Sequence, residues 1–440
     1  LCKSKTMDMT QIGMLAFGAL IVLVVIGVPI AWATALVAFG GLWSLFGLQQ
    51  AATQFFTTGF NTGSEFLFAS IPLFIFMGQV VNLSRIGEDL FSSLYKFFGH
   101  LPGGLLVTTI FACAGFGAVT GVSSAAVGTM SKIALPELQR YRYNMELSTG
   151  SLASAATIAI MIPPSLLMVL YGLWTETSIG KLFLAGIVPG IVTAMVFSAY
   201  VVIRCRMNPE LGPKGPSFSW GERIRSLWKV IPVVLIFMVV IVGMYVGLFT
   251  PGEGAAVGAF FTTVLARAMG RIKWSDLRVA FIDTARLSAM IFCVLIAASV
   301  LARFLVATQV TTLVTDSIAS LGYNRYVILF VICVMYLILG CLLDAFGMIL
   351  LTLPFVFPII IHLGFDPVWF GVILVVLTEV ALITPPVGLN VFILAKMCDQ
   401  ASMTEIFRGA MPFVAMSLLV ILLITIFPDL ALWMPSTMIK

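Results

Sequence analysis

Long stretches without a charged side chain run through this sequence and leave few folds open to it. Ile12–Gly47 and Ile231–Thr250 contain no Asp, Glu, Lys or Arg. About 20 consecutive apolar residues are enough for a helix to cross the hydrocarbon core of a bilayer. Only 10% of the 440 residues are charged, whereas soluble domains carry about 25%. The sequence therefore predicts an all-α protein that crosses a membrane several times.

The side chains that usually build catalytic or metal centres are sparse. The seven Cys are scattered, mostly inside apolar runs, where Cys behaves as a small apolar side chain. His100 and His362 lie at the ends of expected helices, so neither is placed to assist a serine nucleophile. There is no Gly-x-Ser-x-Gly motif and no phosphate-binding loop of an ATPase. We therefore expect neither an enzyme nor an ATP-driven permease.

The prolines reveal an internal repeat. Four of them recur at one fixed interval along the chain, the first set being Pro29, Pro136, Pro163 and Pro164 and the second Pro251, Pro358, Pro385 and Pro386. Proline makes up about 5% of an average sequence, so fewer than about one such match is expected by chance. We therefore predict two homologous halves, residues 10–205 and 230–430, joined by a polar, basic loop at 206–229 and flanked by tails at 1–9 and 431–440.

Each half contains one stretch that is unsuited to a simple membrane-spanning helix. TGVSSAAVGTM (Thr120–Met130) gathers two Gly, two Ser and two Thr inside an apolar run. GCLLDAFG (Gly340–Gly347) has a similar pattern and adds the carboxylate of Asp344. Backbone that turns at membrane depth is tolerated only where it is buried in protein or lines a polar cavity. We therefore expect a re-entrant helical hairpin at 104–138 and another at 326–363.

The distribution of basic residues favours an inverted arrangement of the two halves. If each hairpin enters and leaves on the same side, each half crosses the membrane five times, and this odd number turns the second half upside down. With the loop at 206–229 in the cytoplasm, 17 of the 24 Lys and Arg residues fall on the cytoplasmic side, as the positive-inside rule requires. Both termini would then face the periplasm.

A Pro-Pro pair interrupts the apolar span that follows each hairpin. IPPS (Ile162–Ser165) divides residues 147–174, and TPPVG (Thr384–Gly388) divides residues 368–397. Proline removes a backbone donor and clashes with the carbonyl four residues earlier, so each span should be a broken helix. Unwound carbonyls at the membrane midplane can bind Na⁺, and the starts of half-helices can bind anions. One hairpin tip and one broken helix from each half should form composite sites near the membrane centre.

Three polar residues near these features are further candidates for a functional role. Arg303 ends an apolar run, where it either snorkels to the membrane surface or pairs with an anionic substrate. Asn390 follows the second break and can offer its side-chain oxygen to a cation. Glu379 precedes that break by five residues. It either bridges helices or carries a proton, and the sequence does not decide between the two.

Seven stretches, in order along nearly the whole chain, resemble the large membrane subunit of TRAP transporters, the tripartite ATP-independent periplasmic transporters. They are SIPLFIFMGQVV (Ser70–Val81), GAVTGVSSAAVGTM (Gly117–Met130), IPPSLLMVLYG (Ile162–Gly172), SIGKLFLAGIVPG (Ser178–Gly190), FTPGEGAAVGA (Phe249–Ala259), LDAFGMILLTLPFVFPI (Leu343–Ile359) and TPPVGLNVF (Thr384–Phe392).

This resemblance implies a function and a set of partners. The family imports organic anions, such as C4-dicarboxylates, sialic acid or sulfonates, across the bacterial inner membrane. Import is coupled to Na⁺, with two or more ions expected, and no organic cofactor is needed. A periplasmic substrate-binding protein delivers the substrate, and a small four-helix membrane subunit, expected as a separate chain, supports the large one. The large subunit is similar to elevator carriers, in which the two hairpins and two broken helices form a transport domain that slides against a scaffold.

The resemblance also implies site residues. The substrate would contact Ser123 and Ser124 at the first hairpin, Ser165 after the first break, Asp344 at the second hairpin and, through a looser match, Arg303. One Na⁺ would be held by the first hairpin and the first break, at Gly121, Ser124, Ile162 and Pro164. Another would be held by the second hairpin and the second break, at Gly340, Asp344, Thr384, Pro386, Gly388 and Asn390.

A stand-alone Na⁺- or H⁺-coupled dicarboxylate symporter is the main alternative. Such carriers share the paired hairpins, but their tips usually read Ser-Asn-Thr. Here the tips read VSSA and LDAF. The sequence identifies neither the substrate nor the oligomeric state.

Overall fold

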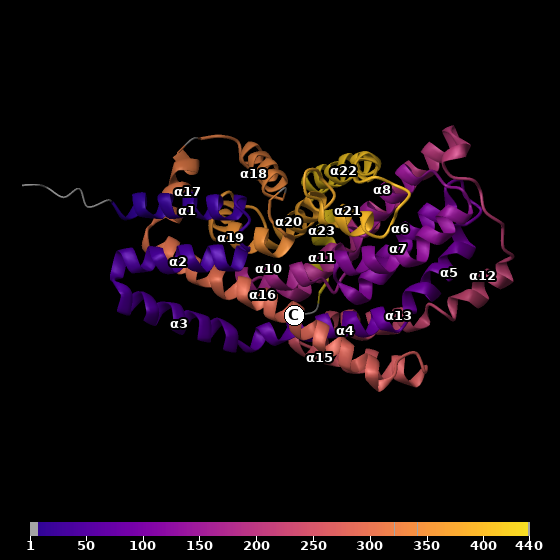
Figure 1. Ribbon diagram of the computed structural model, residues 1–440, viewed down its shortest axis with the longest axis horizontal. Coiled ribbons are helices and arrows are strands. Elements are labelled where there is room, and N and C mark those ends of the chain that lie inside the picture. The colour runs from indigo at the N-terminus through magenta and orange to yellow at the C-terminus, as the bar shows by residue number, and fades with distance from the viewer. Residues whose placement is uncertain (1–7, 321, 341, 439–440) are drawn as a thin grey trace, which may run out of the picture. The chain divides into compact units, whose positions relative to one another are not determined.

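The computed structural model describes residues 8–320, 322–340 and 342–438, and the regular elements within this part are all helical (Figure 1). Five helices are long and apolar enough to cross a membrane, or up to seven if each of two bent helix pairs forms one span, judged by length and composition. Several shorter apolar helices accompany them. The prediction of an all-α protein with several membrane-spanning helices is confirmed at this level.

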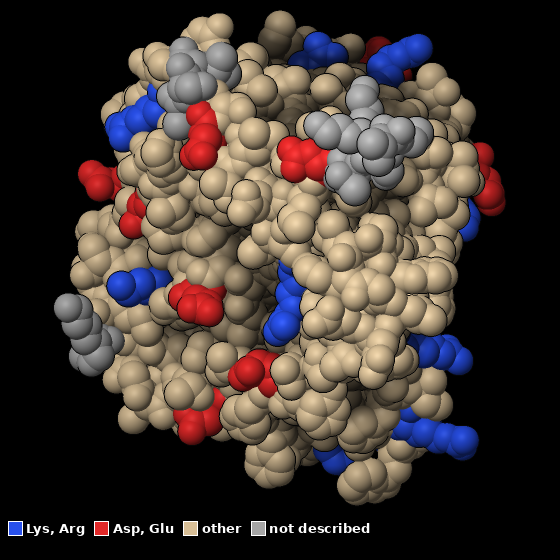
Figure 2. Space-filling view, turned by 90° about the vertical axis from the view of Figure 1, so that its left-hand side faces the viewer, with Lys and Arg blue, Asp and Glu red and all other residues tan. Residues whose placement is uncertain are grey.

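Large apolar side chains on the outside fit a lipid environment. Trp32, Phe56 and Phe60 are 68%, 72% and 74% exposed. Figure 2 shows a face on which uncharged residues predominate, while acidic and basic side chains stand in separate small patches. Large exposed patches of apolar side chains are rare on soluble monomers. A bilayer, by contrast, solvates such side chains.

The helices gather into two compact units, and each unit takes segments from both halves of the sequence. Unit one comprises the residues up to Phe68 together with Leu287–Pro367. Unit two comprises Ala69–Arg286 and the residues from Val368 onward. The long helix α16 (Trp274–Ala307) therefore begins in unit two and ends in unit one.

Unit one begins with three consecutive helices separated by glycine breaks. Gly27 and Gly47, with φ of +90° and +82°, adopt left-handed conformations that favour glycine. A methyl group at Gly41 would meet the ring of Phe304, so this glycine allows close packing against α16. The helices are α1 (Met9–Val25), α2 (Ile30–Phe46), α3 (Leu48–Ser64) and the short 3₁₀ helix η1 (Phe66–Ala69). The sequence did not predict α3, because its Gln, Thr and Asn residues interrupt the apolar pattern.

The rest of unit one contains the second predicted hairpin. Its helices are α17 (Val310–Ser320), α18 (Arg325–Leu339) and α19 (Ala345–His362), and α19 packs against both of the others. Residue 341, which belongs to the predicted tip, lies outside the described residues, as do parts of both predicted tails.

Unit two contains the first predicted hairpin and both predicted broken helices. Its centre is α6, where all but two of 17 residues are buried. Next to it, α8 packs along α22 where Gly150 and Gly409 allow the backbones to approach. The first-half helices are α4 (Ser70–Leu83), α5 (Ile86–Phe98), α6 (Gly104–Thr120), α7 (Ser123–Arg140), α8 (Met145–Ala155), α9 (Ile158–Met161), α10 (Leu166–Thr175) and α11 (Ile179–Met207). The later ones are α13 (Ile231–Phe237), the π-helix η3 (Met238–Val242), α14 (Gly243–Tyr245), α15 (Pro251–Ala268), α20 (Pro367–Ala381), α21 (Leu389–Ala395), α22 (Met403–Ile426) and α23 (Asp429–Ser436).

The segment 206–229 was predicted to be a loop, and this is wrong in part. It contains the short 3₁₀ helix η2 (Pro209–Leu211) and the amphipathic helix α12 (Trp220–Leu227). The Ser219 side chain accepts from the Glu222 N–H, and the Glu222 carboxylate accepts from the Ser219 N–H at 2.9 Å. This reciprocal capping box satisfies backbone donors at the start of α12 and favours the helix.

The same linker is hydrogen-bonded to both ends of the first hairpin. Gly103, just before α6, donates its N–H to the Gly212 carbonyl at 3.0 Å. Asn144, after α7, donates its N–H to the Leu211 carbonyl at 3.0 Å. The Tyr143 hydroxyl donates to a carbonyl of the same segment at 2.7 Å, and burial raises the pKa of Tyr143 to about 12. The linker is therefore part of the packed structure of unit two.

Helix boundaries repeat along the chain with the spacing of the prolines. The helices α7 (123–140) and α19 (345–362) have the same length. Their first residues, and likewise their last residues, are as far apart in the sequence as Pro163 and Pro385. The helices α5 and α17 end at residues 98 and 320, again separated by this interval. A Pro-Pro pair with a cis bond follows each hairpin, at 163–164 and at 385–386. The order of a helical hairpin followed by a broken helix thus occurs twice.

Candidate functional site

The tip of the first hairpin, hereafter hairpin one, consists of two residues between α6 and α7. Gly121 has φ of +65°, in the left-handed region, and Val122 is extended before α7 begins at Ser123. The Gly121 N–H donates to the Gly117 carbonyl at 2.9 Å, which closes the end of α6. The start of α7 leaves backbone N–H groups without partners in the helix, as at any helix N-terminus.

The tip of hairpin one lies directly against the first Pro-Pro break. The Leu166 N–H donates to the Gly121 carbonyl at 3.4 Å. A methyl group on Gly121 would meet the carbonyl oxygen of Pro164. Ser165 is buried and caps α10, since its Oγ accepts from the Met168 N–H at 3.3 Å. The structure therefore brings together Gly121, Pro164 and Ser165, which were predicted to serve neighbouring sites.

Ile162 and Ser124 are the other two residues predicted around hairpin one. Ile162 ends α9 in an extended conformation, and its N–H donates to the Ile158 carbonyl at 3.3 Å. A carbonyl at this C-terminal position has no partner within the helix, so it can serve a ligand. Ser124 is half-buried in the first turn of α7.

A buried carboxylate links hairpin one to the second broken helix. The Ser123 hydroxyl donates to Oε1 of Glu379 on α20 at 3.2 Å. Both residues are buried, with 4% and 1% exposure. Oε2 of Glu379 has no hydrogen-bond partner among the described residues. Of the two roles that the sequence left open for Glu379, bridging helices is observed here, and the Ser123 hydroxyl predicted to meet substrate is engaged in that bridge.

The second break folds back on itself around Asn390. Gly388 has φ of +55° and precedes α21, and the Asn390 N–H donates to the Leu382 carbonyl at 3.1 Å. The Asn390 side chain is fully buried, and its Nδ2 donates to the Ala153 carbonyl on α8 at 3.5 Å. Its Oδ1 has no partner among the described residues. The predicted cation ligand therefore points an unpaired oxygen into the interior of unit two.

Two further predicted ligands lie in the same break. The Thr384 hydroxyl donates to the Val380 carbonyl at 2.7 Å, so its proton is used within α20 while its oxygen can still accept. Pro386 lies between Thr384 and Gly388, in the unwound segment that separates α20 from α21. These residues share one short loop, as the sequence indicated.

Three serines of α8 form a feature that the sequence did not single out. Ser148, Ser151 and Ser154 are buried, and none of their hydroxyls has a hydrogen-bond partner among the described residues. A spacing of three places them along one side of the helix. They flank Ala153, whose carbonyl receives the Asn390 amide. The signal in the sequence was S-x-x-S-x-x-S, which ends eight residues before the first break.

These unpaired polar groups are costly to keep in the protein interior. A buried polar group without a partner costs about 1–3 kcal/mol, and an uncompensated buried charge costs about 3–5 kcal/mol. Natural proteins therefore leave such groups mainly where a ligand, ion or water completes them. Hydroxyl, amide and carbonyl oxygens suit a hard cation such as Na⁺. The described residues contain no group of three or more His, Cys, Asp or Glu that could hold a metal ion, so a transition-metal centre is not indicated in this part of the chain.

The remaining predicted residues, Arg303, Gly340 and Asp344, belong to unit one. Arg303 is exposed on α16. Gly340 follows α18 as its C-terminal cap. Asp344 is half-buried, and it directly precedes α19, where the helix dipole favours a negative charge. Their predicted association with residues of unit two stays a prediction.

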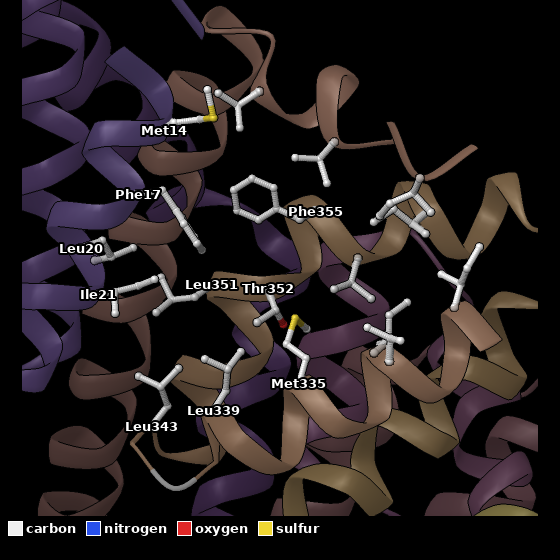
Figure 3. Close-up of a pocket in the computed structure, with 18 of the residues that line it drawn as sticks. Met14, Phe17, Leu20, Ile21, Met335, Leu339, Leu343, Leu351, Thr352 and Phe355 are labelled. Carbon is white, nitrogen blue, oxygen red and sulfur yellow. The ribbon is translucent and has the colours of Figure 1, made fainter. Parts of the chain in front are cut away.

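Unit one also contains a partly open cavity of about 660 Å³, lined by residues of α1, α17, α18 and α19. Figure 3 shows the rings of Phe17 and Phe355 side by side, with their centroids 5.1 Å apart, and Met335 and Leu339 lower in the view. Its lining is almost entirely apolar, and the Thr352 hydroxyl is hydrogen-bonded to Tyr336 at 2.5 Å. An organic anion would find no charge partner in such a lining, so this cavity is unsuited to anion binding.

Comparison with known proteins identifies the family. The sequence matches the family described as tripartite ATP-independent periplasmic transporter, DctM component, over residues 17–430. The chain belongs to this family. The resemblance to TRAP large subunits is thereby confirmed, and this DctM-family chain is a multi-pass membrane protein of a transporter.

Curated relatives of this DctM-family chain differ in the substrates that their names state. The C4-dicarboxylate TRAP transporter large permease protein DctM of Pseudomonas aeruginosa is 31% identical over 86% of this chain and 88% of its own length. The ectoine/5-hydroxyectoine large permease protein UehC of Ruegeria pomeroyi is 30% identical over 95% and 97%. The isethionate permease protein DctMQ of Oleidesulfovibrio alaskensis is 29% identical over 95% of this chain and 65% of its own.

Two solved transporters share the fold of this DctM-family chain. The YdaH transporter of Alcanivorax borkumensis has a TM-score of 0.61 at 14% identity, with 96% of this chain and 99% of that chain covered. MtrF of Neisseria gonorrhoeae, described among antimetabolite efflux pumps, has a TM-score of 0.58 at 11% identity, with 96% of each chain covered. At these identities the likeness concerns the fold alone.

Proposed function

We propose that this DctM-family chain imports an organic anion, coupled to Na⁺, across the bacterial inner membrane. The names of relatives that transport C4-dicarboxylates and isethionate support an anionic substrate. A periplasmic binding protein delivers the substrate, and a separate small membrane subunit supports this chain. The chain itself performs transport and no chemical conversion.

The proposal includes two inverted repeats, residues 10–205 and 230–430, that work as an elevator. Support comes from the helix boundaries that recur at the interval of the prolines and from the hairpin and broken helix in each half. Five crossings in each half, with the 206–229 linker in the cytoplasm, place both termini in the periplasm. The loops with the most basic residues then lie on the cytoplasmic side, which agrees with the positive-inside rule.

The single observation that carries the proposal is the contact of hairpin one with both broken helices. The Gly121 carbonyl accepts from Leu166 at the first break, and Ser123 donates to Glu379 on α20. A small movement of the tip would therefore change the surroundings of both breaks together. Such an arrangement suits coupling, in which occupancy of an ion site and of a substrate site stabilise each other.

In this proposal the residues of unit two have different roles. The oxygens of Gly121, Ser124, Ile162 and Pro164 hold one Na⁺, and those of Thr384, Pro386, Gly388 and Asn390 hold another. The free N–H groups at the start of α7 and the Ser124 hydroxyl orient the carboxylate or sulfonate of the substrate. Ser123 positions the tip of hairpin one through its hydrogen bond to Glu379, and Ser165 caps α10. Gly340, Asp344 and Arg303 of unit one are proposed to serve ions and substrate as the family resemblance implies.

Thermal unfolding in detergent tests the Na⁺ proposal. Wild type, Ser124→Ala and Asn390→Ala are compared in NaCl, KCl and choline chloride at constant ionic strength. A ligand that binds only the folded state stabilises it by about 2.7 kcal/mol at 100 times its dissociation constant. We expect a Na⁺-specific rise of the midpoint in wild type that is weaker in both variants.

Matched controls separate ion binding from general destabilisation. Ser92 is half-buried on α5 like Ser124 on α7, and Asn208 is exposed at the end of α11. Ser92→Ala and Asn208→Ala should keep the full Na⁺-specific rise. An equal response of all variants, or no difference between NaCl and KCl in wild type, would remove the support for Na⁺ sites at these residues.

A further inference from the structure

Glu379 has an environment that the proposed Na⁺ sites do not account for. Among the charged side chains in the described part of the chain, it alone is buried, with 1% exposure. It lies near the end of α20, where every residue from Val368 to Ala381 is buried. Apart from Thr378, its neighbours within four positions on this helix are all apolar.

The charged groups of the surrounding helices do not compensate this carboxylate. No Lys or Arg forms an ion pair with Glu379 in the described residues. Contacts with α20 include those of α7 through Ser123, of α10 and α11 through Tyr171 and Leu182, and of α22 through Ile424. Their titratable or charged side chains, with those of the adjoining α6, α8 and α21, are Cys113, Lys132, Glu137, Arg140, Glu146, Tyr171, Lys181, Tyr200, Arg204, Cys205, Arg206, Lys396, Glu405 and Arg408.

Lys132 and Tyr171 illustrate the separation between these groups and the carboxyl group. Lys132 follows Ser123 by nine residues on α7, which corresponds to about 13 Å of helix. Tyr171 faces Phe370, with ring centroids 6.5 Å apart, and Phe370 precedes Glu379 by nine residues, again about 13 Å. Among the described residues, the carboxyl group has one hydrogen bond, from the Ser123 hydroxyl to Oε1.

We propose that Glu379 is a proton-binding site that controls the docking of hairpin one. With a proton on Oε2, the side chain is a neutral acid, and Oε1 still accepts from Ser123. Without that proton, a full charge remains in an apolar region, which is far less favourable than a neutral hydroxyl group without a partner. The reaction is a simple exchange, in which the carboxylate takes a proton from water and later returns it.

The proposal assigns an opposite effect to the two protonation states. The neutral acid tolerates burial and keeps the tip of hairpin one against α20. The charged form draws water or a cation toward Oε2, and this requires the tip to move away. Raising the pH through the titration of Glu379 should therefore loosen this contact. The inference rests on the Ser123–Glu379 geometry and does not depend on the proposed substrate or on Na⁺ coupling.

Infrared difference spectroscopy of the purified full-length protein tests the proposal without any transport assay. Spectra are recorded across a pH series in H₂O and in D₂O. We expect a carbonyl band of a buried protonated carboxyl group that shifts in D₂O and disappears as the pH is raised. The band should be absent in Glu379→Gln and retained in Glu210→Gln, since Glu210 is exposed in the linker. A spectrum without this band in wild type, or one that keeps it in Glu379→Gln, would overturn the proposal.

A second variant keeps the test valid if Glu379→Gln fails to fold. Ser123→Ala removes the hydrogen bond to Oε1 and leaves the carboxyl group in place. Its band should persist but move to a higher wavenumber, because the carbonyl has lost its donor. An unchanged band position in Ser123→Ala would show that the band belongs to another carboxyl group, and this too would overturn the assignment.

The unfolding midpoint distinguishes a proton from Na⁺ at the same carboxylate. For a proton site, the midpoint of wild type should fall as the pH is raised, and Glu379→Gln should show a smaller fall with an intact Na⁺-specific rise. If instead Glu379→Gln loses the Na⁺-specific rise while wild type shows no carboxyl band, Glu379 is a Na⁺ ligand and the proposal is wrong. Loss of the Na⁺ response at Ser124 and Asn390 alone would bear only on the proposed function.

Discussion

Gly121 meets two requirements that no other residue can meet together. Its φ of +65° lies in the left-handed region, and the position of a side chain is already taken by the carbonyl oxygen of Pro164. The first requirement is local, and the second comes from a residue 43 positions later. A tertiary contact, as well as the local backbone conformation, therefore requires glycine at this position.

The substitution Gly121→Ala should be strongly destabilising. A left-handed alanine costs about 1–2 kcal/mol, and overpacking against the first break adds about 1–3 kcal/mol. We expect a loss of about 2–5 kcal/mol in the free energy of unfolding, measured by denaturant titration in detergent. Gly128→Ala is the matched control in the same hairpin, because nothing lies within 4 Å of its Cβ position. It should be neutral or slightly stabilising, and similar losses in both variants would contradict the argument.

At the scale of single residues, the sequence predicted the kinds of atoms better than their partners. It indicated Gly121, Pro164 and Asn390 from breaker patterns, and these residues do lie at helix breaks. It could not predict that Ser123 pairs with Glu379, because those residues are 256 positions apart and no local pattern connects them. The serine row of α8 was missed for a related reason, since serines inside an apolar helix usually bond to their own backbone.

At the scale of elements, an ionic cluster holds the amphipathic helix α5 to two other segments. Asp89 contacts Arg271 at 2.5 Å and Lys229 at 3.8 Å, and its side chain is only 14% exposed. Arg271 follows α15, and Lys229 lies at the end of the linker. The cluster therefore ties three segments of unit two together.

Removing the charge of Asp89 should weaken this connection. Hydrogen bonds to charged groups contribute about 1.5–3 kcal/mol, so Asp89→Asn should lower the free energy of unfolding by about that amount. Asp283→Asn is the control, because Asp283 is 43% exposed and its pair with Arg286 spans 3.6 Å on one helix. Exposed pairs of this kind contribute about 0.5 kcal/mol or less. Unfolding titrations of both variants at low and high salt measure the difference, and equal effects would speak against a structural role of the cluster.

The capping box of α12 should make this helix sensitive to acid. The Glu222 carboxylate accepts from the Ser219 N–H and hydroxyl, and these hydrogen bonds lower its pKa. A lowered pKa in the folded state means that the stabilisation is complete above the ordinary value of about 4.3. It is lost as the pH falls through the lowered value. Hydrogen exchange of the α12 amides should therefore accelerate below that range in wild type, whereas in Glu222→Gln it should vary little with protonation.

The sequence indicates some helices clearly and others not at all. Residues Ile86–Phe98 show the pattern of an amphipathic helix in the sequence, and α5 has these bounds. Strong periodicity, with acidic residues in the first turn and Lys96 in the last, explains this agreement. By contrast, α3, α12 and α23 were not expected, since polar residues or prolines interrupt their apolar patterns. Packing against neighbouring helices, which a local pattern does not report, stabilises them.

At the scale of the whole molecule, the proposed function depends on a periplasmic binding protein that presents the substrate. Uptake into proteoliposomes that contain this chain and its small subunit should require both an inward Na⁺ gradient and the cognate periplasmic binding protein. Radiolabelled C4-dicarboxylate and isethionate are suitable probes, because relatives transport them according to their names. A potassium gradient should give background uptake. Uptake that is equally fast without the binding protein would favour the stand-alone symporter.

The division of the molecule into compact units could not be predicted from its repeats. The sequence halves meet within the linker, whereas each unit draws helices from both halves. Contacts such as Gly150 against Gly409 in unit two depend on matched surfaces of segments far apart in the chain. A repeat shows which segments are alike, but it does not show which of them pack together.

The hydrogen bonds between the linker and hairpin one have a consequence for how such a protein can change over evolutionary time. A connection that only joined two duplicated halves would be free to gain or lose residues. Here Leu211, Gly212 and Pro213 accept hydrogen bonds from both ends of the hairpin, so insertions at these positions would disturb it. If the chain consists of two homologous halves, as we propose, the linker between them also supports hairpin one, so the halves could not be exchanged as independent modules.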